Sequence, residues 1–462
     1  GRIVSEEIHR FENVLLKKDG FLVWDTEMLF GEIKKGLALC KTAGKIPESV
    51  AIDMWGVDYV LLDENDKLVG HAVSNRDPRT EGMDAVLSER ISEREMYEIA
   101  GIQKMTLNTV YQLLSTSKNQ PEWIEKAKTF LMLPDYMTFM LSGAKKCEYT
   151  NASTTSLMDA RTHKWSERLL SACGVSPEIM PEIVMPGTVA GNLLPEIQAE
   201  VGFDCKVVYA ASHDTGSAVV SVTEKDCIYI SSGTWSLIGV ERIEPDASEK
   251  SMKHNFTNEG GYERRYRYLK NIMGLWIIQE SRRQWKREGK DYSFAQMEAW
   301  AKEAKPFQSL INPDYASFNT PGNMPEKIRE FCRMTGQHVP ETVGEVVRCI
   351  YESLALKYRY TVENIQNVRG KKATMINVVG GGTKDHFLSQ MTADACGLEV
   401  SAGPEEATSI GNLLAQMMAV GAIANLSEAR EVVANSFEVK HYTPCADRSA
   451  WDEAYGRFCK LL

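Results

Sequence analysis

Apolar residues along the chain recur in two patterns, one typical of buried strands and one typical of amphipathic helices. Short apolar runs of strand type are found at Ile3 to Phe11, Gly20 to Trp24, Ser49 to Ile52, Tyr59 to Leu62 and Lys206 to Ala211. Helical spacing is found from Thr26 to about Gly44 and over Met83 to Gly101, Thr109 to Lys118, Pro121 to Ala127 and Pro134 to Ser142. The first half therefore opens with strands and continues with helices and strands in alternation.

The second half of the chain partly repeats this order. A hairpin is expected at residues 228–240, followed by a strand at Tyr266 to Leu269 and helices at Gly274 to Arg287 and from Val343 to Val368, as one long helix or two. A strand at Met375 to Val379, a helix at Lys384 to Cys396, a strand at Glu399 to Ala402 and a helix at Ala407 to Met418 complete the pattern. We predict an α/β fold with two similarly built domains, residues 1–222 and 223–462.

The bulk composition limits the class of partner. A chain of 462 residues with 43% hydrophobic and 25% charged residues is typical of a globular protein with more than one core. Its formal net charge of -10 disfavours a nucleic-acid backbone or an anionic membrane as the main partner. A small anionic ligand in a local donor-rich pocket remains compatible with this charge.

The ten cysteines show neither zinc-site spacing nor a disulfide framework. They are scattered with no Cys-x-x-Cys pair, and no secretory signal accompanies them. Reduced thiols in a cytoplasmic protein are therefore expected. The longest apolar helical stretch, Leu413 to Leu426, is interrupted by Gln416 and Gly421 and is too short to span a bilayer.

One carboxylate is predicted to follow the end of a buried strand. Asp214 lies in the turn after Ala211, flanked by His213 and Thr215, and small residues suited to a closely packed helix come next. Ligand sites concentrate at such strand ends in α/β sheets. Asp214 is therefore a candidate base, and a solvated turn carboxylate is the alternative.

Two loops could hold an anion. Ser231-Ser232-Gly233-Thr234 joins the hairpin strands with more N–H and O–H donors than a turn requires, although an ordinary hairpin turn has the same residue types. Gly380-Gly381-Gly382 joins a buried strand to a helix, where glycines let a ligand approach the backbone. The alternative is a tight turn without a ligand. No Walker A box or G-x-G-x-x-G motif is present.

A fourth group could contact a sugar. Trp55 offers an apolar face of the kind that packs on sugar C–H groups, and Asp53 and Asp58 could accept hydroxyl protons. For Trp55 taken alone, a core residue between two strands is the more common case. Two phosphate-type loops and one strand-end carboxylate together favour phosphoryl transfer from a nucleotide to a hydroxyl, which depends on positioning, Mg²⁺ and a base.

With these residues assembled, the chain resembles the FGGY carbohydrate kinases over nearly its whole length. The segments that carry the resemblance are IDMWGVDYVLLDENDKLVG (52–70), ASHDTGSAV (211–219), YISSGTWSLIGVE (229–241), TNEGGYERRYRYLKNIMGLW (257–276), VVGGG (378–382) and ADACGLEVSAGPEEATSIGN (393–412). HDT with SSGTWSL and LKNIMGLW resembles one branch of the family, the kinases that transfer the ATP γ-phosphate to the 1-hydroxyl of L-rhamnulose.

The resemblance implies two actin-like (RNase H-like) ATPase domains flanking a catalytic cleft, with sugar held by the N-terminal domain and nucleotide by the C-terminal domain. It implies ATP and Mg²⁺ as cofactors and L-rhamnulose as the sugar. The residues it assigns are Asp214 as catalytic base and magnesium ligand, His213, Asp214, Thr215, Gly70 and Asn271 as sugar-binding residues, and Thr234, Gln279, Gly381 and Gly382 as ATP-binding residues. Trp55 is added to the predicted sugar-binding residues because of its aromatic side chain, and the resemblance does not assign it.

One departure from the family pattern concerns the first phosphate loop. The family opens with a strand and an Asp-x-Gly-(Ala/Ser)-Ser-Ser-Gly-Arg loop, whereas this sequence starts at Gly1-Arg2, at the second strand. We expect the natural protein to have the loop and a chain beginning at Gly1 to be inactive.

Two other functions stay open. One is a kinase for another ketose, such as L-fuculose or D-xylulose. The other is a non-catalytic sugar-binding regulator on the same scaffold, although no helix-turn-helix or basic face is visible in the sequence. Monomer and dimer are both compatible with the sequence.

Overall fold

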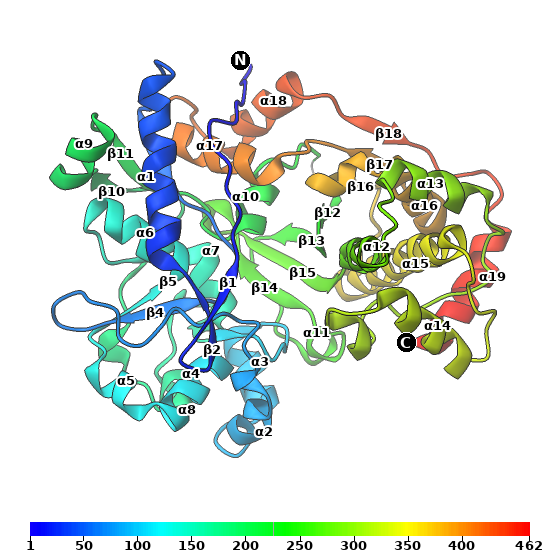
Figure 1. Cartoon of the computed structure of the whole chain (residues 1–462), viewed down its shortest axis with the longest axis horizontal. Coiled ribbons are helices and arrows are strands. Elements are labelled where there is room, and N and C mark those ends of the chain that lie inside the picture. The colour runs from blue at the N-terminus through cyan, green and yellow to red at the C-terminus, as the bar shows by residue number, and fades with distance from the viewer. Residues whose placement is uncertain (225) are drawn as a thin grey trace. The chain divides into compact units, whose positions relative to one another are not determined.

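The computed structural model describes residues 1–224 and 226–462 (Figure 1). The chain divides into two compact units. The first unit comprises Gly1–Ser221, Glu241–Tyr268 and Ala407–Ser436, and the second comprises Val222–Val240, Leu269–Glu406 and Phe437–Leu462. Residues after 222 therefore contribute to both units.

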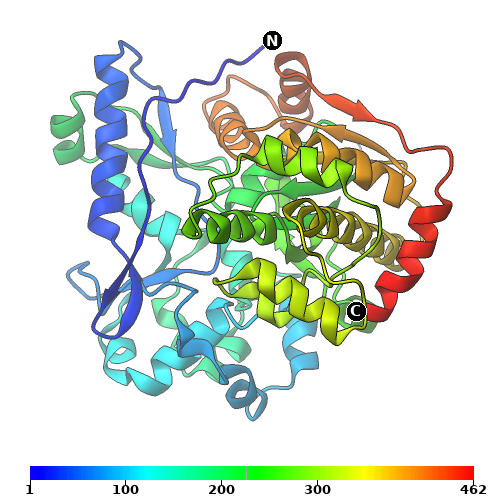
Figure 2. The same cartoon turned by 45° about the vertical axis from the view of Figure 1, so that its right-hand side comes forward.

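The first unit begins with an irregular segment and a hairpin. The hairpin strands are β1 (Leu15–Lys18) and β2 (Phe21–Trp24), and Asp25 caps the following helix α1 (Thr26–Thr42) by accepting from the Met28 N–H. The strand expected at Ile3 to Phe11 is wrong. That segment lies along α1 instead (Figure 2), with Glu6 paired to Lys45 and His9 to Glu32, so its backbone has no strand partner.

A three-stranded sheet forms the part of the first unit that positions the candidate base. Its order is β10 (Thr188–Asn192), β11 (Lys206–Tyr209), β3 (Ser49–Ala51), with β11 parallel to β3 and antiparallel to β10. Helix α6 (Leu133–Ser142) packs on β10 and β11, and α17 (Ala407–Ala419) packs on β3 and β11. Apolar side chains such as Leu37, Leu141 and Val207 fill the core beside this sheet.

A second core of the first unit lies around the paired strands β4 (Tyr59–Leu62) and β5 (Thr129–Met132). The single helix expected over Met83 to Gly101 is two helices, because Ser92 accepts from the Glu95 N–H and so starts a new one. The other elements are α2 (Met83–Ser88), α3 (Glu93–Ala100), α4 (Thr109–Asn119), α5 (Pro121–Lys126), β6 (Cys147–Glu148), α7 (Tyr149–Ala152), β7 (Met158–Asp159), β8 (Lys164–Trp165), α8 (Glu167–Cys173), β9 (Ile183–Val184), α9 (Pro195–Val201), α10 (Asp214–Val220), α11 (Glu249–Lys253), β14 (Thr257–Gly260) and α18 (Leu426–Ser436).

The second unit is built on a mixed sheet. Its strands run in the order β15 (Tyr266–Met273), β13 (Trp235–Arg242), β12 (Ile228–Ser232), β16 (Met375–Val379), β17 (Glu399–Ala402), β18 (Lys440–Tyr442). The predicted hairpin is confirmed as β12 and β13, and β16 lies parallel to both β12 and β17.

Helices complete the second unit. The segment expected as one or two helices is a single helix, α15 (Val343–Arg369), which packs against α13 (Phe294–Glu303) and α16 (His386–Cys396) (Figure 1). The other helices are α12 (Trp276–Arg287), α14 (Met324–Met334) and α19 (Ser449–Phe458). Across residues 1–224 and 226–462, no helix combines the length and apolarity needed to cross a membrane.

Helices α10 and α17 of the first unit approach each other closely. A Cβ at Gly411 would lie 1.8 Å from the carbonyl oxygen of Ser217, so only glycine fits this position. Gly216, on the same helix as Ser217, faces Thr150, where a Cβ would lie 3.2 Å away. Small residues thus allow α10 to pack closely against α17 and Thr150, as the sequence pattern after Asp214 predicts.

This contact leads to a prediction about stability. Gly411→Ala should lower the unfolding midpoint and cost about 1–3 kcal/mol, because the added methyl group collides with backbone that cannot rotate away. Thermal unfolding followed by circular dichroism measures the effect. Gly456→Ala is the matched control: Gly456 lies exposed in α19 with open space at its Cβ, so alanine should stabilise by about 0.5–1 kcal/mol. Equal responses of the two variants would contradict the packing argument.

Candidate active site

Asp214 is the first residue of α10, just beyond the end of β11. Its backbone N–H donates to the Met54 carbonyl, which ties the turn to the end of β3. Its Oδ1 accepts from the Thr215 N–H (2.6 Å) and the Thr215 hydroxyl (3.2 Å), and 46% of the side chain is exposed. Burial of the surroundings raises the pKa of Asp214, and the donors of Thr215 oppose that rise because they favour the carboxylate. The carboxylate is therefore held in place and still open to a reactant.

Asp53 is a second carboxylate beside Asp214. Its Oδ2 accepts from Asn412 Nδ2 at 2.5 Å, and Asn412 is itself held by Gln416, which in turn accepts from the Ser49 hydroxyl. Burial, together with the charge of Asp214, raises the pKa of Asp53 to about 7, although the hydrogen bond from Asn412 opposes the rise. Two repelling carboxylates at the ends of adjacent strands are an arrangement that a cation would stabilise.

His213 connects Asp214 to a buried ion pair. Its Nε2 lies 3.5 Å from Asp214 Oδ1, and its Nδ1 lies 2.9 Å from Arg267 Nη2. Arg267 also lies 3.2 Å from Glu259. Burial, and after it the charge of Arg267, hold the pKa of His213 well below its usual range. The imidazole is therefore neutral in this site.

A buried carboxylate orders the backbone before His213. Glu148 accepts from the Ser212 N–H (2.9 Å), the Ser212 hydroxyl (2.8 Å) and the Thr150 N–H (2.9 Å). The Thr150 hydroxyl in turn accepts from the His213 N–H at 3.1 Å. This network fixes the loop that carries His213 and Asp214 onto α7.

Glu148, Glu259, Arg267 and Asn412 were not found by sequence reasoning. Arg267 is the one whose pattern carried a signal, because a charged residue between apolar neighbours of a predicted strand points to a buried partner. The others lie in segments far apart in the sequence, and nothing in their local pattern links them to Asp214.

In the second unit the two predicted anion loops lie side by side. A Cβ at Gly382 would lie 2.0 Å from the Ser232 hydroxyl, and Gly380 has a φ of 89° and approaches the Ser232 carbonyl. Thr234 Oγ1 lies 3.4 Å from Gln279 Oε1, and the Thr234 carbonyl accepts from the N–H groups of Gly274 and Trp276. The predicted ATP-binding residues thus include one in the hairpin turn, Thr234, and its neighbour Gln279. The loop that carries Gly381 and Gly382 contacts the same hairpin at Ser232.

The other predicted sugar-binding residues have separate surroundings. Gly70 has a φ of 70° and faces the Trp123 ring. Trp55 packs against Trp24 with the two rings tilted by 41° and donates to Asp58, a buried carboxylate that also accepts from Trp24 and Asn75. Asn271 lies on β15 in the second unit and is partly exposed.

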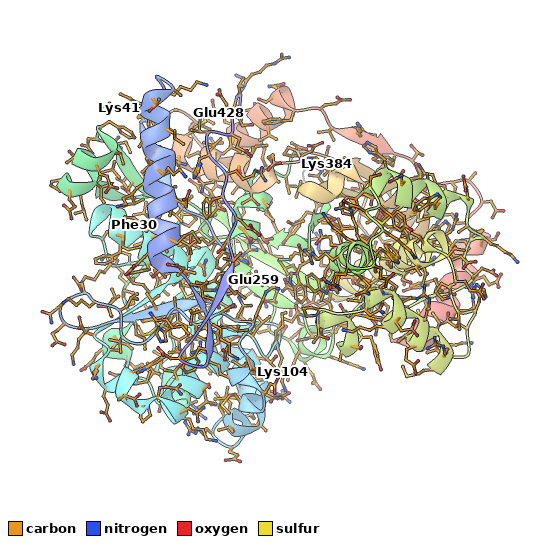
Figure 3. The ribbon with its side chains drawn as sticks, viewed as in Figure 1. Phe30, Lys41, Lys104, Glu259, Lys384 and Glu428 are labelled. Carbon is orange, nitrogen blue, oxygen red and sulfur yellow. The ribbon has the colours of Figure 1, made fainter. Side chains whose placement is uncertain are left out.

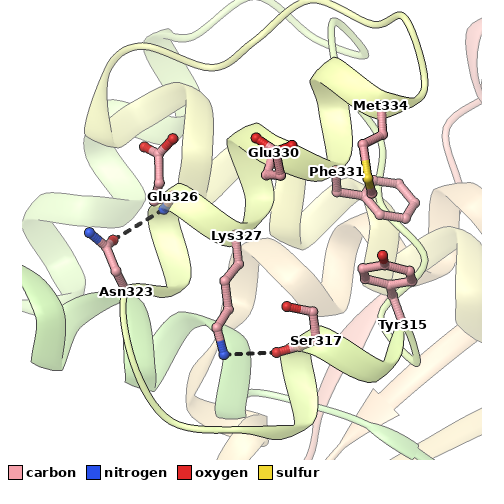
Figure 4. A pocket seen from close by; sticks show the side chains of 8 residues that line it. All are labelled: Tyr315, Ser317, Asn323, Glu326, Lys327, Glu330, Phe331 and Met334. Carbon is pink, nitrogen blue, oxygen red and sulfur yellow. Dashed lines mark hydrogen bonds between the residues drawn. The ribbon is translucent and has the colours of Figure 1, made fainter.

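A surface pocket of about 320 Å³ lies between the 3₁₀ turn Ala316–Asn319 and α14 (Figure 4). Lys327 donates to the Ser317 carbonyl and Asn323 caps α14 at the Glu326 N–H, so these polar groups serve the fold. Within residues 1–224 and 226–462, no cluster of three or more His, Cys, Asp or Glu side chains could hold a metal ion by itself.

A strand-end carboxylate in one unit and two glycine- and hydroxyl-rich loops in the other are features that the class of phosphotransferases uses. Family models agree with this class. The N-terminal domain of the FGGY family of carbohydrate kinases matches residues 1–221, and its C-terminal domain matches residues 228–420. The chain belongs to the FGGY family of carbohydrate kinases. It is therefore a sugar phosphotransferase, and its predicted fold class is confirmed.

Curated relatives are similar over nearly their full length. A rhamnulokinase of Halalkalibacterium halodurans is 47% identical over 448 residues, which cover 97% of this chain and 95% of the relative. A rhamnulokinase of Bacteroides thetaiotaomicron is 41% identical over 461 residues, covering 99% and 94%. A rhamnulokinase of Bacillus subtilis is 40% identical over 447 residues, covering 96% and 91%.

Solved structures share the fold at low sequence identity. A ligand-bound xylulose kinase from Lactobacillus acidophilus has a TM-score of 0.81 and 18% identity, covering 97% of this chain and 91% of that one. A glycerol kinase of Plasmodium falciparum with ADP has a TM-score of 0.78 and 16% identity, with coverages of 97% and 91%. These similarities support the fold and leave the substrate to other observations.

The raised pKa of Asp53 predicts a pH-dependent stability. An exposed Asp has a pKa of about 3.9, so between pH 4 and 7 the folded chain holds a proton that the unfolded chain has released. The stabilising contribution is complete below about pH 4 and is lost as the pH rises through about 7. Relative to Asp53→Asn, the wild type should lose about 2 kcal/mol of stability between pH 5 and 8.

Unfolding midpoints of the two proteins across this pH range measure the difference. Asp63→Asn is a control, because backbone donation from Lys67 lowers the pKa of Asp63 and its contribution is lost only on acidification. The Asp63 variant should therefore differ from the wild type by a constant amount between pH 5 and 8. A constant difference for Asp53→Asn as well would refute the assignment.

Proposed function

We propose that the chain is a rhamnulokinase: an ATP-dependent kinase that phosphorylates the 1-hydroxyl of L-rhamnulose to L-rhamnulose 1-phosphate in L-rhamnose catabolism. The observation that carries the proposal is the 40–47% identity to rhamnulokinases over at least 96% of the chain. The exposed carboxylate of Asp214, beside a neutral imidazole, supports it because the reaction needs a base at the attacking hydroxyl.

In the proposed reaction, Asp214 accepts the proton of the sugar hydroxyl as that oxygen attacks the γ-phosphorus. The new O–P bond forms while the bond from the γ-phosphorus to the bridging oxygen breaks, and ADP leaves with that oxygen. His213, Thr215, Gly70, Asn271 and Trp55 are assigned to the sugar. Thr215 already donates to Asp214 and so keeps one carboxylate oxygen oriented while the other remains available.

The nucleotide is assigned to the second unit. The turn at Thr234 and the loop at Gly381 and Gly382 present backbone N–H groups of the kind that bind phosphates, and Gln279 orients the Thr234 hydroxyl. The close contact of Gly382 with Ser232 holds the two loops together, so that both can act on one ligand.

The carboxylates present fit Mg²⁺. Asp214 and Asp53 are oxygen donors, and the charge of Asp214 raises the pKa of Asp53, a repulsion that a divalent cation relieves. Asp214 is assigned as the magnesium ligand. When bound, the ion neutralises charge on the transferring phosphate.

A ketose panel tests the substrate. ADP release with ATP and Mg²⁺ should be fastest with L-rhamnulose and slower with L-fuculose and D-xylulose, measured as kcat/KM on the full-length protein. Asp214→Asn is the matched control, since it removes the base while keeping the size of the side chain and should lower kcat by about 10²-fold or more. A clear preference for another ketose would replace the assigned sugar.

Near-normal turnover by Asp214→Asn would show that Asp214 is not the catalytic base. Calorimetric binding of L-rhamnulose without any ADP release by the full-length protein would instead favour the sugar-binding regulator.

Gly381 offers a test of the nucleotide assignment. An added Cβ at Gly381 meets no protein atom within 4 Å, so Gly381→Ala should fold normally. If phosphates lie on this loop, the methyl group should raise the KM for ATP about 10-fold or more with little change in the KM for the sugar. Gly456→Ala, in the same unit with equal free space, should leave both constants unchanged. An unchanged KM for ATP in Gly381→Ala would place the nucleotide elsewhere.

A further inference from the structure

Behind His213 lies a buried chain of charges that the proposed reaction does not use directly. Arg267 on β15 is fully buried, and Glu259 on β14 is 7% exposed at its side chain (Glu259 is labelled in Figure 3). Arg267 Nη1 lies 3.2 Å from Glu259 Oε2, and Arg267 Nε donates to the Gly260 carbonyl at 2.7 Å. A buried guanidinium with these partners cannot rotate or lose its proton.

The position of Arg267 decides which ring nitrogen of His213 carries the proton. Arg267 Nη2 lies 2.9 Å from His213 Nδ1, and a guanidinium nitrogen can only donate. Nδ1 must therefore offer its lone pair, which leaves the proton of the neutral ring on Nε2. Glu259 also approaches Nδ1, at 3.4 Å, but its charge is already engaged by Arg267.

The free side of the imidazole faces the base. His213 Nε2 lies 3.5 Å from Asp214 Oδ1, so an N–H at this position is attracted to the carboxylate. The opposite tautomer would turn a lone pair toward that oxygen and a proton toward the guanidinium, and both contacts would be repulsive. A doubly protonated ring would also turn an N–H toward the guanidinium at Nδ1, so the contact with Arg267 selects the neutral ring.

We propose that Arg267, held by Glu259, is a positioning residue that fixes His213 as the Nε2–H tautomer, so that His213 turns an N–H toward the side of Asp214 and donates it to an oxygen of the sugar. The part concerning catalysis rests on the proposed function, whereas the tautomer itself does not. The sugar group at this position must then be an acceptor, a hydroxyl or carbonyl oxygen.

The tautomer can be observed without substrate. The chain has eight histidines, so ¹⁵N labelling of their rings gives a small set of signals, and His213→Gln identifies those of His213 by their loss. At a single neutral pH, His213 in the wild type should show a protonated Nε2 and an unprotonated Nδ1. A protonated Nδ1 would overturn the proposal whatever the activity of the protein.

Removing the ion pair tests its role. Arg267→Met combined with Glu259→Gln deletes both charges together, which leaves no unpaired buried charge, and should let His213 populate the Nδ1–H tautomer. The expected result is a kcat lowered about 10- to 100-fold, as for other groups that orient a functional imidazole, with a smaller change in the KM for ATP. An unchanged ring spectrum in a folded double variant would refute the positioning role.

A matched pair controls for simple loss of stability. Arg348 and Glu352 form a partly buried ion pair 2.7 Å apart on α15 in the second unit. Arg348→Met combined with Glu352→Gln should lower the unfolding midpoint while leaving the His213 signals and kcat unchanged.

His213→Gln and His213→Asn give a further comparison, since a Gln amide reaches the position of Nε2 and an Asn amide that of Nδ1. His213→Gln should retain more activity than His213→Asn. The reverse order would contradict donation from Nε2.

Discussion

The close approach of α10 and α17 is the constraint on which the first-unit site depends. At Gly411 the two helix backbones come so close that no side chain fits between them. The contact holds α10, whose first residue is Asp214, and it brings Asn412 on α17 to Asp53 at the end of β3. One glycine therefore sets the position of both carboxylates, because it fixes the helix that carries one and the amide that orients the other.

Buried charged side chains also position the loop that carries Asp214. Glu148 accepts from the N–H and hydroxyl groups of Ser212 and Thr150 and from the Asn151 N–H. Arg267 and Glu259 hold the other side of His213. Such groups are costly to bury and are tolerated where their hydrogen bonds are nearly complete. Their effect is to restrict the loop at Asp214 to one conformation before any ligand arrives, which is the preorganisation that electrostatic catalysis requires.

The sequence predicts the local elements well and the relations between distant segments poorly. The hairpin at Ser231 to Thr234, the helix over Thr26 to Thr42 and the strand before Gly380 follow from periodicity and turn residues. The strand expected at Ile3 to Phe11 is wrong because an apolar run does not reveal whether a partner strand is present. Asp214 could be proposed from its place after a strand. The partners of Arg267 and Asn412 could not, since His213 and Asp53 lie 54 and 359 residues away from them along the chain.

The first unit is assembled from three stretches of chain, ending with residues 407–436. A ribosome that has released the first 221 residues has therefore supplied Asp214 but neither the strand that bears Arg267 nor the helix that bears Asn412. The face of β3 and β11 that α17 covers therefore stays exposed until almost the whole polypeptide has emerged. Contacts of such long sequence separation form slowly, and exposed apolar surface is prone to aggregate in the meantime. The arrangement that orients the site thus also delays completion of the first unit until almost the end of synthesis.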